Sequence, residues 1–185
     1  MDLVGTWTGI KSNGTTERYV FGADATFDVG TVNSADGFSS QLQGTFSVAD
    51  QLLTLDMKST DGVGNPIRLQ ITSEPYVNST VLCDQPLRSD NEGGVANGIV
   101  GSWGSTATTQ QLDLSGTPTE APLDNVAWLN LSADGTFESD DNATPGTYTV
   151  DQDTVTTTFS SNGVSAVRSY TFVDGTVLCD PVFRK

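Results

Sequence analysis

The chain has 185 residues, with 23 acidic and 8 basic side chains, no histidine, and a net charge of −15 at pH 7. This acidity argues against nucleic acid and anionic membranes as partners, because both are bound through clustered lysine and arginine. No stretch approaches the roughly 18 apolar residues of a membrane span. The lack of histidine excludes a Ser–His–Asp triad and a Cys–His nucleophile.

Short motifs recur along the chain in the same order, which indicates an internal duplication. Leu3–Trp7 recurs as Ile99–Trp103, and Thr80–Asp84 recurs as Thr176–Asp180, each 96 residues later. Two further matches lie between these ends at a changing spacing, which we attribute to loops of unequal length. They are 21–27 against 131–137, and 44–48 against 146–150.

The duplication divides the chain into copy one (1–88), a polar, glycine-rich linker (89–98) and copy two (99–185). β-Branched residues with frequent Gly and Asp breaks predict many short strands in each copy. Copy one is expected to form strands near 3–10, 17–22, 25–32, 39–48, 51–58, 66–73 and 79–84. Copy two is expected to form strands near 99–106, 109–114, 126–132, 135–139, 146–150, 153–160, 164–173 and 175–180. The predicted fold is therefore all-β, two tandem small antiparallel meander barrels of seven or eight short strands each, because closure removes exposed edges.

A Gly-X-Trp on the first strand, followed by an arginine just after the last strand, resembles the lipocalin and wider calycin pattern. The matching residues are Gly5, Trp7 and Arg88 in copy one, and Gly101, Trp103 and Arg184 in copy two. In that family the tryptophan plugs the closed end of the barrel and the arginine packs across its indole. The resemblance implies barrel closure by Trp7, Arg88, Trp103 and Arg184. Each copy has only about 86 residues, so its own side chains can fill a barrel this small.

The two cysteines occupy equivalent positions, Cys83 and Cys179, near the end of the last predicted strand of each copy. Without a CxxC spacing or a histidine, a zinc site is poorly supported. Three interpretations stay open: two separate buried thiols, one disulfide between the copies, or two reactive thiols.

The strand predicted at 164–173 departs from its counterpart. In Ile67–Ile71 the aliphatic residues share one face and the arginine lies on the other. In copy two, Arg168 shares a face with Tyr170 and Phe172, since alternate residues of a strand point the same way. A cation among aromatic rings at a barrel mouth would suit an anionic apolar ligand such as a fatty acid. The alternative is an exposed aromatic–arginine face.

The acids are mostly aspartate, 18 against 5 glutamates. Aspartate favours turns, and an acidic surface poor in lysine is also typical of proteins from salty habitats. Asp140-Asp141 and Asp151-Gln152-Asp153 carry the oxygen ligands that calcium prefers, but neither lies in an EF-hand or a Gly-Asp nonapeptide loop. We therefore interpret them as turns and expect no metal and no other cofactor.

These observations favour a non-enzymatic protein that binds a small apolar or amphipathic molecule in a barrel. Met1-Asp2 directly precedes the first predicted strand, so we expect a signal peptide to have been removed and the protein to be secreted, periplasmic or on the cell surface. Two alternatives stay open: a structural or surface-interaction module with filled barrels, and a cofactor-free cyclase or isomerase. A cavity of several hundred Å³ would favour binding or catalysis over the filled module.

Overall fold

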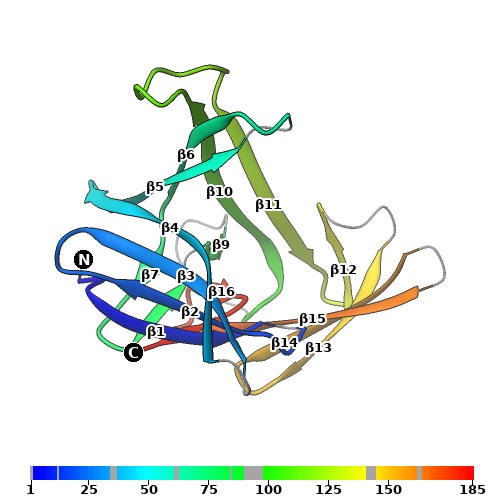
Figure 1. Cartoon of the computed structure of the whole chain (residues 1–185). Helices are drawn as coiled ribbons and strands as arrows, with labels where there is room; N and C mark the ends of the chain where they lie inside the picture. The colour runs from blue at the N-terminus through cyan, green and yellow to red at the C-terminus, as the bar shows by residue number, and fades with distance from the viewer. Residues whose placement is uncertain are drawn as a thin grey trace.

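A computed structural model describes residues 2–11, 13–33, 37–60, 63–83, 85–89, 98–140, 145–161 and 164–185 (Figure 1). Within these ranges the chain is all-β, as predicted, and forms strands but no helix. No helix of the described part is long and apolar enough to cross a membrane. Most of the expected linker, residues 90–97, lies outside the described residues.

The strands follow one another in chain order through the whole described sequence. Their bounds are β1 Gly5–Ile10, β2 Thr16–Phe21, β3 Thr26–Asn33, β4 Gly37–Ala49, β5 Leu52–Thr60, β6 Pro66–Ser73, β7 Tyr76–Val77, β8 Val81–Cys83, β9 Leu87–Ser89, β10 Gly101–Leu112, β11 Leu123–Leu131, β12 Thr136–Ser139, β13 Gly146–Asp151, β14 Thr154–Ser161, β15 Val164–Val173, β16 Val177–Cys179 and β17 Phe183–Arg184. Most coincide with the expected strands to within a few residues.

Four strands differ from expectation. The segments expected as two strands at 99–106 and 109–114 form the single long strand β10, because residues 107–109 pair without a break to both β6 and β11. The short strands β7, β9 and β17 were not expected. Each begins one or two positions after a proline and has only two or three residues, too few for a periodic pattern.

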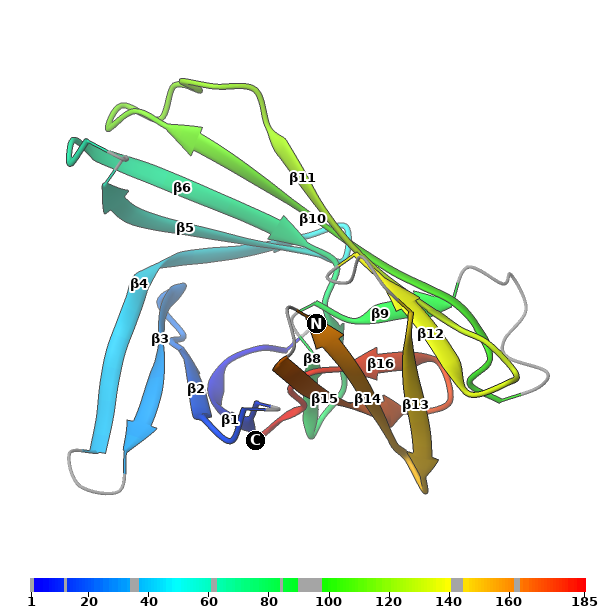
Figure 2. The ribbon, with the colours of Figure 1, turned by 90° about the vertical axis from the view of Figure 1, so that its right-hand side faces the viewer.

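A closed antiparallel barrel of eight strands dominates the C-terminal segment (residues 99–185). Hydrogen-bonded pairs run from β10 through β11, β12, β13, β14 and β15 to β16. The ring is closed by β9, which pairs with β16 on one side and with β10 on the other. Figure 2 shows β9 in green beside β16 in red. The closing strand therefore comes from before the linker.

The N-terminal segment (residues 1–88) is a meander of strands. The strand that lies between its first strand, β1, and β8 is β17, from the C-terminal end of the chain. β1 to β6 pair in sequence, and β6 continues the sheet by pairing with β10. On the other side, β17 lies between β1 and β8, and β8 pairs with β7. In Figure 2, β4, β5, β6, β10 and β11 spread as one continuous wall. The two segments have thus exchanged their last strands.

The two exchanged strands sit in the same register. Arg88 of β9 lies opposite Gly104 and Val177. Arg184 of β17 lies opposite Thr8 and Val81. The pairs Arg88 and Arg184, Gly104 and Thr8, and Val177 and Val81 are each 96 positions apart in the sequence. This is also the spacing of the sequence motifs.

Each exchanged strand also contributes to the opposite hydrophobic core. Phe183 of β17 is fully buried in the cluster around Trp7, where it meets Tyr19 edge to face with ring centroids 4.9 Å apart. Leu87 of β9 is buried in the cluster around Trp103. Removing either short strand would therefore open a core built mostly from the other segment.

Glycines in the middle of each segment make room for an aromatic ring. Gly44 lies opposite Phe27, and Gly146 lies opposite Phe137. A Cβ atom built on Gly146 would come 2.3 Å from the Phe137 ring, and one on Gly44 would come 2.9 Å from the Phe27 ring. Because glycine has no side chain, the phenylalanine ring can lie over the backbone of the neighbouring strand at these positions. This explains the recurring Gly-Thr-aromatic motif.

Trp7 and Trp103 are the largest fully buried side chains, with 0% and 1% of their surface exposed. Each indole N–H donates a hydrogen bond to the carbonyl four residues earlier, Trp7 to Leu3 at 2.7 Å and Trp103 to Ile99 at 2.9 Å. These bonds satisfy the only polar atom of a buried ring. Both side chains are therefore packed inside a hydrophobic core.

The arginines expected over these indoles lie elsewhere. The cation over the Trp7 ring is Lys185, whose Nζ is 5.1 Å from the ring centroid. Arg184 is exposed, and Arg88 forms an ion pair with Glu74 at 3.6 Å. Opposed residues share a face, and Arg88 lies opposite Gly104, the residue after Trp103, so it points to the other face of the sheet. Gly5 leaves space for Lys185, since a Cβ there would lie 2.6 Å from Lys185 Cε.

Replacing Trp7 or Trp103 with Ala should lower the free energy of unfolding by about 3–5 kcal/mol, the usual cost of emptying a buried aromatic site. Trp128, which is 42% exposed, provides the matched control, and Trp128→Ala should cost less than about 1 kcal/mol. Urea denaturation of the three variants measures the difference. Equal losses at all three positions would contradict the assigned burial.

Candidate functional site

A pocket of about 340 Å³ lies at the open end of the eight-stranded barrel. Its floor is the top of the C-terminal core, because Leu87 and Leu178 belong to that buried cluster and Tyr170 packs against it. Tyr19, from β2 of the N-terminal segment, forms part of the wall. The pocket therefore combines residues from both segments around an apolar floor.

Charged side chains surround this floor. Lys11 and Glu17 form an ion pair at 2.9 Å, and Arg168 and Asp180 belong to the same lining. Asp140 also lines the pocket, and its carboxylate accepts a hydrogen bond from a main-chain N–H of β11. The rim thus carries two cations and three carboxylates, and it is polar where the floor is apolar. Such a division suits a ligand with one apolar and one polar end.

Two of the three predicted ligand-binding residues lie together in this pocket. Arg168 and Tyr170 both line it, on the same face of β15. Phe172, two residues further, lies deeper and meets Trp103 edge to face with ring centroids 5.7 Å apart. It supports the floor instead of lining the pocket. Sequence reasoning missed Lys11 and Tyr19, because no local signal shows that β1 and β2 approach the mouth of the other segment.

The interior of the N-terminal segment offers much less space. Its cavity is about 70 Å³ and is bordered by residues of the Trp7 cluster such as Phe27, Leu53 and Met57. Ligand pockets usually measure about 300–1,000 Å³. The N-terminal core is therefore filled by its own side chains, and the pocket at the C-terminal mouth is of a size that can hold a small molecule.

Cys83 and Cys179 are joined in a disulfide, with Cα atoms 5.8 Å apart. Both are buried, in a cluster with Val81, Val173 and Val177 that draws on both segments. The neighbours of each cysteine line the pocket: Gln85 and Leu87 follow the first, and Leu178 and Asp180 flank the second. The cross-link therefore holds together two walls of the pocket.

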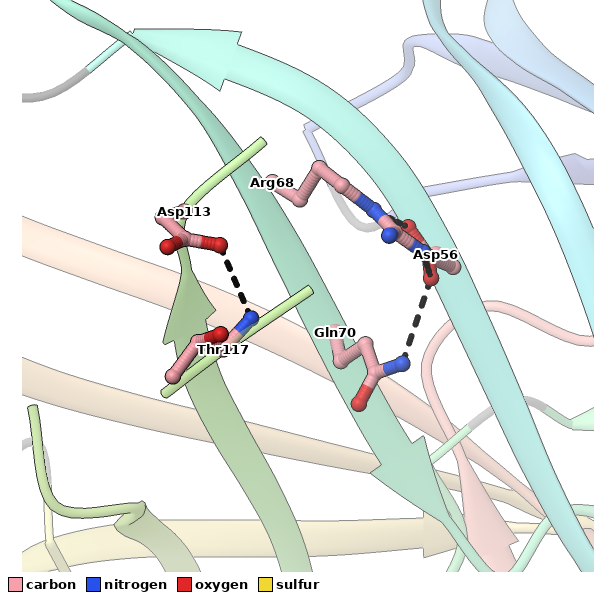
Figure 3. Close-up of polar contacts among 5 residues, drawn as sticks. All are labelled: Asp56, Arg68, Gln70, Asp113 and Thr117. Atoms are coloured by element: carbon pink, nitrogen blue, oxygen red, sulfur yellow. Dashed lines mark hydrogen bonds and ion pairs between the residues drawn. The ribbon is translucent and has the colours of Figure 1, made fainter. Parts of the chain in front are cut away.

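A second polar cluster lies on the outer face of β5 and β6 (Figure 3). Arg68 donates two hydrogen bonds to the Asp56 carboxylate, and Gln70 Nε2 donates a third at 3.2 Å. The neighbouring turn is held by Asp113, which accepts a bond from the Thr117 N–H at 2.8 Å. Asp56 and Arg68 border a broad hollow of about 760 Å³ with Lys58 and Leu114. Their charges are largely engaged with one another, which makes the cluster a structural element.

These contacts shift the titration of the carboxyl groups. Burial alone would raise the pKa of Asp56, but the hydrogen bonds from Arg68 and Gln70 and the attraction of Arg68 outweigh it and lower the pKa. The pKa of Asp113 is lowered by the Ser115 hydroxyl and the Thr117 N–H. Asp24 and Asp134 also have lowered pKa values, through the hydroxyl and N–H of the threonine two residues on. Asp24, Asp113 and Asp134 therefore serve turns.

No metal centre is present among the described residues, where no group of three or more possible ligands comes together. Asp151 and Asp153 lie at an exposed turn, and Asp141 lies outside the described residues.

Replacing both cysteines with Ala should lower the free energy of unfolding by about 3–5 kcal/mol. The reason is that the disulfide closes a loop spanning 96 residues and so restricts the unfolded chain. Urea denaturation with and without dithiothreitol measures the effect. The reductant should destabilise the parent and leave the double variant unchanged; a parent insensitive to complete reduction would contradict the expected contribution.

Acid should destabilise the protein through the carboxyl groups with lowered pKa values. A carboxyl group whose pKa falls on folding stabilises the native state above its ordinary value of 3.8, and this contribution disappears as pH falls through the native pKa. Asp56→Asn should therefore flatten the fall in unfolding free energy between pH 5 and pH 2, as measured by urea denaturation. Asp151→Asn, at an exposed aspartate, is the control. A parent-like acid profile for Asp56→Asn would exclude this cluster as a source of the acid sensitivity.

Comparison with protein-family models, with curated proteins and with solved structures gives no match. The resemblance to lipocalins thus stays a prediction from the motifs.

Proposed function

We propose that this chain is a non-enzymatic binding protein for a small amphipathic molecule, which it holds in the pocket at the mouth of the eight-stranded barrel. The observation that carries the proposal is the joint position of Arg168 and Tyr170 above the apolar floor formed by Leu87 and Leu178. The apolar end of the ligand packs on the floor, and its polar end reaches the charged rim.

The size and the composition of the pocket support this function. A volume of about 340 Å³ lies at the lower end of the range for small-molecule sites, so a compact or medium-length ligand is favoured. The planar donors of the Arg168 guanidinium match the geometry of a carboxylate. The interior of the N-terminal segment is filled by side chains, which favours a structural role for that half. The alternative of a structural module with a filled barrel therefore applies to this part of the chain.

We further propose that the two segments are duplicated lipocalin-like units and that the protein is exported. The shared register of β9 and β17 supports the duplication, since equivalent residues pair with equivalent partners 96 positions apart. The buried disulfide is compatible with an oxidising compartment outside the cytosol. The net charge of −15 supports the absence of nucleic-acid partners.

Arg168→Ala should weaken the binding of decanoic acid at pH 7 by about ten- to a hundred-fold, because a charge-assisted hydrogen bond to a carboxylate is lost. Binding of decanol, which has the same chain without the charge, should change much less. Isothermal titration calorimetry with both ligands measures the two effects, and Lys58→Ala, at an exposed cation remote from the pocket, is the control variant.

Two outcomes of this titration would contradict the proposal. If the parent binds neither decanoic acid nor decanol, or if Arg168→Ala binds both as the parent does, the pocket is not an amphiphile site. The filled module then becomes the better account of both segments. A ligand recovered chemically altered after incubation would instead favour the cyclase or isomerase alternative.

A further inference from the structure

Trp128 differs from the other two tryptophans because 42% of its surface is exposed. It lies on β11, where its main-chain N–H donates to the Asp140 carboxylate at 3.2 Å and its main-chain carbonyl accepts from the Asp140 N–H at 3.3 Å. These two bonds fix its backbone next to β12. A half-exposed indole on a main chain held in this way offers a surface for stacking, because no rotation of the main chain must be frozen on binding.

Trp128 is one wall of a slot on the outer face of the sheet. Three residues lie in a row across neighbouring strands, with Arg88 of β9 opposite Gly104 of β10, and Gly104 opposite Trp128. Directly opposed residues point to the same face, and neighbouring strands lie about 4.8 Å apart, so the Cα atoms of Arg88 and Trp128 are separated by roughly 10 Å. Between them the glycine offers only backbone. All three border one hollow of about 380 Å³.

The hollow of about 380 Å³ has room for one saturated ring beside the indole. The guanidinium is held in place, since Arg88 Nη2 donates to the Glu74 carbonyl at 3.5 Å and pairs with the Glu74 carboxylate at 3.6 Å. The Arg88 wall of the slot is therefore in position before a ligand arrives.

The groups around the slot alternate between apolar surface, donors and acceptors. The indole supplies a flat apolar face, Arg88 supplies donors, Glu74 supplies acceptors, and Thr106 lies in the same hollow with a hydroxyl group. A pyranose ring matches this pattern, because its C–H groups form an apolar face and its hydroxyl groups around the edge both donate and accept. The net charge of −15 disfavours an anionic sugar.

We propose that the slot formed by Arg88, Gly104 and Trp128 binds a pyranose unit of a neutral oligosaccharide, which stacks on the Trp128 indole. This site goes beyond the proposed function: Trp128 borders both hollows, but Arg88 and Gly104 line only the slot, and Arg168 and Tyr170 line only the mouth pocket. The glycine is the selective element: a side chain at position 104 would stand in the space that the sugar ring occupies.

The test is isothermal titration calorimetry of the full chain with cellohexaose, mannohexaose and, as the anionic comparison, oligogalacturonate. The parent should bind at least one of the two neutral oligosaccharides and bind oligogalacturonate more weakly. Trp128→Ala should weaken binding about tenfold or more, whereas Trp128→Phe should retain part of it. Gly104→Val should abolish binding with Trp128 intact, and Arg168→Ala should leave it unchanged. Circular dichroism and thermal melts confirm that each variant is folded.

Three results would overturn the proposal: binding of neither neutral oligosaccharide, tighter binding of oligogalacturonate, or unchanged binding in both folded variants, Trp128→Ala and Gly104→Val. Loss of binding in Arg168→Ala alone would place the sugar in the mouth pocket and likewise refute the slot.

Discussion

The backbone pairing of β9 and β17 with the opposite segment is the constraint on which the rest of the structure depends. These strands contain three and two residues, yet one closes the eight-stranded barrel and the other joins β1 to β8. With them, Leu87 and Phe183 enter the opposite cores. Because each core is completed from outside its own segment, the stability of one half is tied to the presence of the other.

The mouth pocket follows from this exchange. Its walls are residues just after Cys83, residues around Cys179, and Tyr19 from the second strand. None of these groups would meet if each segment closed on its own last strand. The disulfide lies where the two segments meet and fixes the chain immediately before both exchanged strands. Under the proposed function, a ligand at the mouth would contact this exchanged arrangement and so stabilise the folded chain.

Much of the fold could be predicted from local pattern. Turn residues and alternating apolar positions located most strands, and period two placed Arg168 and Tyr170 on one face. The exchange could not be predicted, because partner choice for two or three residues depends on tertiary contacts. The cation over Trp7 was expected to be Arg88 of the same segment and is instead Lys185, because β17 from the far end of the chain pairs with β1. Lys11, Tyr19 and the slot at Trp128 depend on distant strands and left no local signal.

The disulfide has a further consequence for the covalent connectivity of the chain. Every peptide bond between Cys83 and Cys179 lies within a closed covalent loop, so one proteolytic cut there yields two fragments that stay bonded to each other. Each fragment also keeps its hydrogen bonds to the other through the exchanged strands. A protein connected in this way can be nicked between its halves without losing either core. In surroundings rich in proteases, its working lifetime would be set by cuts outside the loop or by reduction of the disulfide.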